Sequence, residues 1–135
     1  MKTLHLRILP DAYEISVDAQ LLARLDGGPR ALLSGAGKRL RDADIEAAIE
    51  RSEDWLMPHS KSFHGFELQV QDETGRLRRG LGDAASFTPE EVERAFSRAF
   101  DDVAFNRPLD PGYLADIVLL RELVHHGALT RVVLL

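Results

Sequence analysis

The stretch from Asp110 to Gly127 constrains the fold more than any other part of the sequence. Asp110 is a good helix N-cap, and Pro111 suits the first helical position, where no backbone N–H is needed. Gly127 can adopt the left-handed conformation that closes a helix. Between them, apolar residues occupy most of the circumference and leave a narrow polar strip. A helix of this kind needs other elements packed around it, so we expect it in the core.

The segment from Arg131 to Leu135 follows this helix and is predicted as a buried strand. Val132 to Leu135 is apolar throughout, so the strand must lie inside a sheet or pair at an edge with another chain. We favour the interior position, because the buried helix needs a sheet to cover. A homodimer formed through the terminal strand is the alternative.

The first forty residues predict two strands and a short helix. Residues 3–9 and 13–17 alternate apolar with polar side chains, the period of a half-buried strand. Asp18 is then expected to cap a short helix, Ala19 to Asp26, which the two glycines after it would close. We expect residues 29–41 to form a short helical turn and a loop.

The middle of the chain predicts two amphipathic helices around a hairpin. Asp42 to Met57 has one apolar face and stops at Pro58, and Thr88 begins a second helix with a capping box. Phe96 and Phe100 are predicted to face the central helix. The hairpin is expected to join a strand at 66–71 to one containing Leu77 and Leu81. The chain is thus predicted as one α+β domain, residues 1–135. We expect about five antiparallel or mixed strands with helices mainly on one face.

Composition excludes several classes of site and partner. The chain has no cysteine, which rules out disulfides, zinc–thiolate sites and cysteine nucleophiles and is compatible with a cytoplasmic location. The formal net charge is −5, and clustered Lys and Arg are needed to hold phosphate backbones, so neither nucleic acid nor a membrane surface is expected as partner. Ser34 to Lys38 resembles a phosphate loop only in part, because the first glycine and the final hydroxyl are missing.

The two acidic helices suggest a binding surface for another protein with a basic surface. We interpret the chain as a small non-enzymatic protein-binding module, of the adaptor, inhibitor or immunity type. The carboxylates assigned to this surface are Asp44, Glu46, Glu50, Glu53, Asp54, Glu90 and Glu93.

The alternative is a small enzyme or ligand-binding domain with its site in the 58–66 loop. This loop holds the densest run of reactive side chains, and histidines titrate near neutral pH. His59 or His64 would act as a general base, with Ser60 or Ser62 as nucleophile.

No cofactor is predicted, and no metal, because the sequence contains no complete ligand set. Glu122 and His126 form the alternative metal site, since residues four apart share one helical face. A third ligand would have to come from His59, His64 or a carboxylate. Arg76, Arg78 and Arg79 are interpreted as charges that keep an edge strand soluble.

Overall fold

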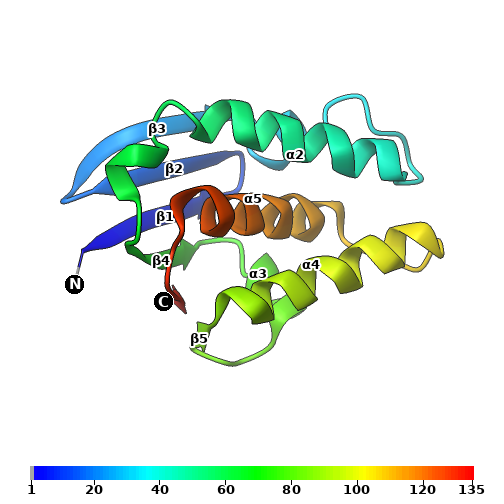
Figure 1. Ribbon diagram of the computed structural model, residues 1–135. Helices are drawn as coiled ribbons and strands as arrows, with labels where there is room; N and C mark the ends of the chain where they lie inside the picture. Colours follow the sequence, from blue (N-terminus) through cyan, green and yellow to red (C-terminus); the bar gives the residue numbers. More distant parts are fainter. Residues whose placement is uncertain (1) are drawn as a thin grey trace.

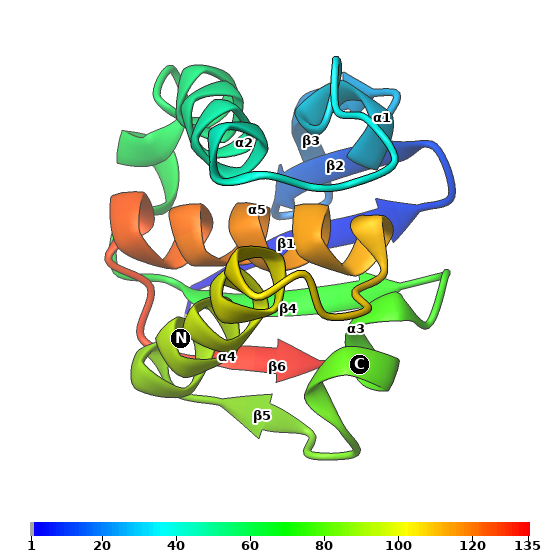
Figure 2. The same cartoon turned by 90° about the vertical axis from the view of Figure 1, so that its right-hand side faces the viewer.

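The computed structural model describes residues 2–135, which form two layers, a six-stranded mixed sheet and a layer of helices (Figure 1). The strand order is β3-β2-β1-β4-β6-β5. Three long helices, α2, α5 and α4, cover one face of the sheet, as Figures 1 and 2 show from two sides. The strands are β1 Thr3–Leu9, β2 Ala12–Val17, β3 Gln20–Asp26, β4 Glu67–Asp72, β5 Ser86–Phe87 and β6 Val132–Leu134. The helices are α1 Pro29–Leu32, α2 Asp42–Leu56, the 3-10 turn η1 Ser60–Phe63, α3 Arg76–Leu81, α4 Pro89–Ala104 and α5 Pro111–Gly127. The predicted α+β class and single helical layer are confirmed.

The first three strands form an antiparallel meander. In β1, Leu4, Leu6 and Ile8 are buried under the helices, while the residues between them face solvent. The helix predicted for residues 19–26 is wrong, because this segment is strand β3, paired with β2. Asp18 and Ala19 both have positive φ, at 50° and 62°, so they turn the chain directly back into the sheet instead of capping a helix.

Strand β4 runs parallel to both β1 and β6. The hairpin predicted after it is wrong, because the chain turns away into helix α3, and Arg76, Arg78 and Arg79 lie on this helix instead of an edge strand. The Asp72 carboxylate causes the turn by accepting hydrogen bonds from the N–H groups of Thr74 and Leu77. Gly75, with φ of 76°, completes it.

Helix α5 lies at the centre of the molecule, as its apolar circumference predicts. It packs between α2 and α4 on one side of the sheet, and most of its residues are buried. Asp110 caps it by accepting a hydrogen bond from the N–H of Gly112. The left-handed residue at its end is Ala128, with φ of 47°, and Gly127 is still helical. The Cβ of any other residue at 127 would meet the Phe63 ring at 2.7 Å, so glycine here permits close packing.

Strand β6 lies inside the sheet, between β4 and β5. Val132 and Leu134 are buried, and the predicted interior position is confirmed. Both edges of β6 are already paired, so the homodimer suggested through this strand has no free edge to use.

Helix α4 begins with the predicted capping box, in which Thr88 and Glu91 bond each other's backbone N–H groups. Phe96 is buried against α5, whereas Phe100 is only half-buried, because it lies toward the outer side of the stripe. Within residues 2–135, no helix is long and apolar enough to cross a membrane.

Candidate functional site

The 58–66 loop packs against the end of α5. The N–H of Gly65 donates to the carbonyl of Gly127 at 2.7 Å, and the Phe63 side chain is fully buried. The Ser60 hydroxyl donates to the carbonyl of Met57 rather than to a histidine. His59 and Ser60 are half-buried, while Ser62 and His64 are exposed. Catalysis by these four residues remains a prediction.

The two acidic helices lie on the same side of the sheet, with α5 between them (Figure 1). Glu46, Glu50, Asp54, Glu90 and Glu93 are exposed, and Glu53 is half-buried. Asp44 was wrongly assigned to this surface, because it is only 7% exposed and belongs to the N-terminus of α2. Its carboxylate accepts a hydrogen bond from the N–H of Arg41. Burial acts to raise the pKa of Asp44, but the hydrogen bonds from Arg41 prevail and lower it.

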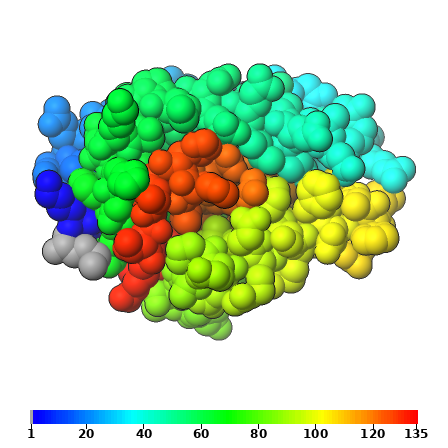
Figure 3. Space-filling view, in the orientation of Figure 1, coloured from blue at the N-terminus to red at the C-terminus, as the bar shows by residue number. Residues whose placement is uncertain are grey.

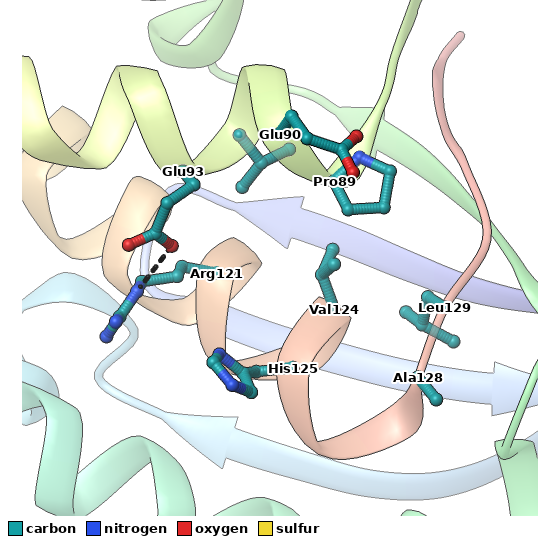
Figure 4. Close-up of a pocket in the computed structure, with 9 residues that line it drawn as sticks. Pro89, Glu90, Glu93, Arg121, Val124, His125, Ala128 and Leu129 are labelled. Carbon is teal, nitrogen blue, oxygen red and sulfur yellow. Dashed lines mark hydrogen bonds and ion pairs between the residues drawn. The ribbon is translucent and has the colours of Figure 1, made fainter.

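A hollow opens between α2 and α4, with α5 as its floor (Figure 3). Part of it is a cavity of about 440 Å³ between the start of α4 and the last turns of α5 (Figure 4). On its wall, Arg121 donates to the Glu93 carboxylate at 2.9 Å and lies over the Phe96 ring, 4.4 Å from its centroid. His125 lines the same cavity. The cavity lining is mostly apolar, and Arg121 and Glu93 form an ion pair on it.

Glu122 and His126 come together on the other flank of α5, as their spacing predicts. The third group beside them is the carboxylate of Glu53 on α2, one of the acidic residues that the sequence assigned to a different role. His126 Nε2 lies 3.3 Å from Glu122 Oε1 and 3.7 Å from Glu53 Oε2. His59 and His64 do not belong to this cluster. The sequence could not identify Glu53 as the third member, because it lies 69 residues before Glu122 (122 − 53) on another helix.

A basic crevice of about 270 Å³ lies where α5 begins, between the loop before α2 and the link from α4 to α5. The loop before α2 contributes Lys38 and Arg39, and the link between α4 and α5 contributes Arg107. Asp102, the carboxylate in this lining, accepts a hydrogen bond from Arg107 Nε at 2.9 Å. With three cations and one carboxylate, the crevice lining has a formal charge of +2, whereas the whole molecule has a net charge of −5. The basic run at 38–41 was the available signal in the sequence, although the segment was predicted only as a loop.

The same end of the molecule is held together by a buried network of Tyr13, Arg76 and Asp116. The Arg76 guanidinium donates two hydrogen bonds to the Asp116 carboxylate, at 2.9 and 3.0 Å, and Tyr13 donates a third. Burial raises the pKa of Asp116, against the opposing effect of these hydrogen bonds. Burial and the neighbouring Asp116 charge raise the pKa of Tyr13. The network anchors α3 and β2 to the first half of α5.

No protein-family model and no curated protein sequence matches this chain. Solved structures share its whole fold. The Ppx/GppA enzyme of Aquifex aeolicus superposes with a TM-score of 0.66 at 10% identity, over 99% of this chain and 53% of that protein. An exopolyphosphatase from Cytophaga hutchinsonii gives 0.67 at 13% identity, over 98% and 52%. An exopolyphosphatase-like protein gives 0.67 at 9% identity, over 99% and 54%. The chain therefore spans about half the length of the proteins whose fold it shares.

These likenesses correct the functional interpretation. The hypothesis of a non-enzymatic adaptor, inhibitor or immunity-type protein is wrong, because this chain shares its fold, over almost its whole length, with about half of a Ppx/GppA enzyme and about half of an exopolyphosphatase. The alternative of a small enzyme or ligand-binding domain agrees better with this finding. At these identities the likeness establishes the fold alone.

Proposed function

We propose that this chain is a phosphate-handling domain that binds linear phosphate chains in the basic crevice. The chemical class is the phosphoanhydride, whether in inorganic polyphosphate or in a nucleoside triphosphate. The observation that carries the proposal is that Lys38 and Arg39 form no ion pair within residues 2–135, although both line a crevice. The likeness to an exopolyphosphatase and to an exopolyphosphatase-like protein supports the same class of ligand.

The chemistry of the crevice suits an extended anion. An arginine presents a planar fork of donors that matches two phosphate oxygens, while a lysine acts as a movable point charge. A second hollow of about 480 Å³ shares Arg39 and Leu40 with the crevice and extends to Arg41, whose guanidinium is paired with Asp44. Cations lining a concave surface focus the field and raise the local concentration of an anionic ligand.

Position within the fold also favours this crevice. In open sheets with parallel strands, ligands bind outside the carboxyl ends of those strands. Helices α2 and α5 each precede a strand that runs parallel to β1, so their N-termini lie toward that end. The segments that line the crevice are the ones leading into these two helices.

Hydrolysis of the terminal phosphoanhydride is the activity that we assign to this site. Asp102 would orient the attacking water, because it is the carboxylate among the cations and Arg107 fixes its position. The second candidate site, the 58–66 loop, lies at the opposite end of α5 and has no comparable group of cations.

Titration calorimetry with sodium tripolyphosphate tests the proposal. Combining Lys38→Ala with Arg39→Ala should weaken binding by about tenfold or more and reduce its dependence on salt, because two charge contacts are lost. Arg94→Ala, an exposed cation on α4 outside the crevice, is the matched control and should leave affinity unchanged. Equal affinity in the double variant and the control would reject the crevice.

Two further measurements test the identity of the ligand and the hydrolytic activity separately. ATP titrated in place of tripolyphosphate distinguishes a nucleotide site from a polyphosphate site. Phosphate release should fall in Asp102→Asn while tripolyphosphate affinity is retained, because the cations remain. Binding without phosphate release in the unaltered protein would reduce the function to phosphate-chain binding.

A further inference from the structure

We infer that Glu53, Glu122 and His126 form a site for a divalent transition-metal ion, separate from the proposed phosphate crevice. Their three donor atoms all lie within 4.8 Å of one another. The site is distant from the crevice, because Glu122 lies about 16 Å along α5 from Pro111 at about 1.5 Å per residue. It therefore stands whether or not the crevice binds phosphate.

The spacing of the donor atoms fits a single ion. Zinc binds imidazole nitrogen and carboxylate oxygen at about 2.0–2.2 Å, so neighbouring ligands of a tetrahedral ion lie about 3.4 Å apart. His126 Nε2 lies 3.3 Å from Glu122 Oε1 and 3.7 Å from Glu53 Oε2, on either side of that value. Little rearrangement is needed for the three groups to share one ion.

The burial of Glu122 is a second observation that favours a bound cation. Its side chain is only 4% exposed. Oε2 accepts a hydrogen bond from Arg121, and Oε1 lies against the His126 imidazole without a hydrogen bond between them. Removing a carboxylate from water is costly unless its charge is matched, so an ion held between Oε1 and His126 would stabilise Glu122 in this position.

The ligand set and its access indicate the class of metal. One imidazole with two carboxylates suits zinc or manganese, whereas magnesium and calcium favour oxygen ligands alone. Three protein ligands leave coordination positions for water, the arrangement of open metal sites. Glu53 and His126 have side chains 41% and 28% exposed, so the ion can enter from solvent. The bound ion would also tie the last turn of α2 to α5.

Calorimetric titration of the metal-free protein with zinc chloride, and separately with manganese chloride, tests this inference. We expect one ion per chain, and an affinity at least about tenfold weaker in His126→Ala and in Glu53→Gln, since each removes a ligand. His125→Ala is the matched control, because His125 is the adjacent histidine and lies in the neighbouring cavity instead. It should bind zinc as the unaltered protein does.

Two further measurements check that the variants fold and that the imidazole coordinates the metal. Melting curves recorded without metal establish that each variant folds, and Glu53→Gln changes the most exposed of the three ligands and is the safest in this respect. X-ray absorption of the zinc-loaded protein should show one imidazole in the coordination shell, lost in His126→Ala. Zinc binding no tighter in the unaltered protein than in His126→Ala, or lost equally in His125→Ala, would overturn the inference. The cluster would then be a contact between an imidazole and two carboxylates that holds no metal.

Discussion

Asp116 illustrates at the scale of single residues how the tertiary structure gives a side chain its role. In the sequence it only interrupts an apolar helix, and in the structure it is the acceptor for both Arg76 and Tyr13. Arg76 comes from a segment that the sequence predicted as a strand, 40 residues earlier along the chain. Sequence periodicity carries no information about pairing at such a separation. For the same reason, the sequence did not reveal that Glu53 on α2 lies beside Glu122 and His126 on α5.

Replacing Asp116 by Ala should cost about 3–5 kcal/mol of unfolding free energy, because it leaves the partly buried Arg76 charge and the buried Tyr13 hydroxyl without an acceptor. Asp11→Ala is the matched control. Its ion pair with Arg30 is exposed on both sides, so its loss should cost less than about 1 kcal/mol. Urea denaturation of both variants measures the difference. Similar losses in the two would show that the buried network contributes no more than a surface pair.

At the scale of elements, the sequence was sufficient where a segment carries both periodicity and caps. Helix α4 has its capping box and apolar stripe, and α5 its Asp110 cap and buried circumference, so both were predicted close to their observed bounds. Strand β3 was missed because its leucines at 21, 22 and 25 have helical spacing, and an edge strand needs no strict alternation. Helix α3 was missed because its six residues are too few to display a helical period.

The two phenylalanines of α4 provide a test at this scale. Phe96 is 8% exposed and lies under the Arg121 guanidinium, so Phe96→Ala should cost about 3–5 kcal/mol. Phe100→Ala should cost clearly less, because half-buried side chains leave smaller cavities. Chemical denaturation of the two variants under the same conditions decides the order. The reverse order would mean that the stripe packs through its other side.

For the whole molecule, the class and the single helical layer followed from the alternation of helices and strands, but the strand order did not. The sequence predicted about five strands, of which the one with Leu77 and Leu81 is helix α3, and it missed both β3 and β5. Strand β5 has only two residues and no pattern of its own. The crevice was missed for a related reason. Its cations come from two loops, 38–39 and 107, which only the packing of α2, α4 and α5 brings together.

The central position of β6 leads to a prediction about the sheet as a whole. Val132 is 1% exposed between two neighbouring strands, so Val132→Lys would bury an unpaired charge. The variant should therefore be unfolded at room temperature and show no cooperative melting transition. Gln20→Lys, on the exposed edge strand β3, should change stability by no more than about 0.5 kcal/mol. Circular dichroism melting curves of the two variants provide the comparison. A cooperative transition retained in Val132→Lys would mean that β6 is not needed inside the sheet.

The insertion of β6 between β4 and β5 also implies an order of folding events. The meander β1-β2-β3 joins neighbours in sequence and can form early, since short loops cost little entropy to close. Leu68 of β4 pairs with Val132, far along the chain, and everything between them must already be nearly in place. Contacts of this range slow folding, so docking of β6 belongs to the last steps. Until β6 docks, one edge of β4 stays unpaired and can pair with strands of other molecules. This stage of folding is therefore the most prone to aggregation.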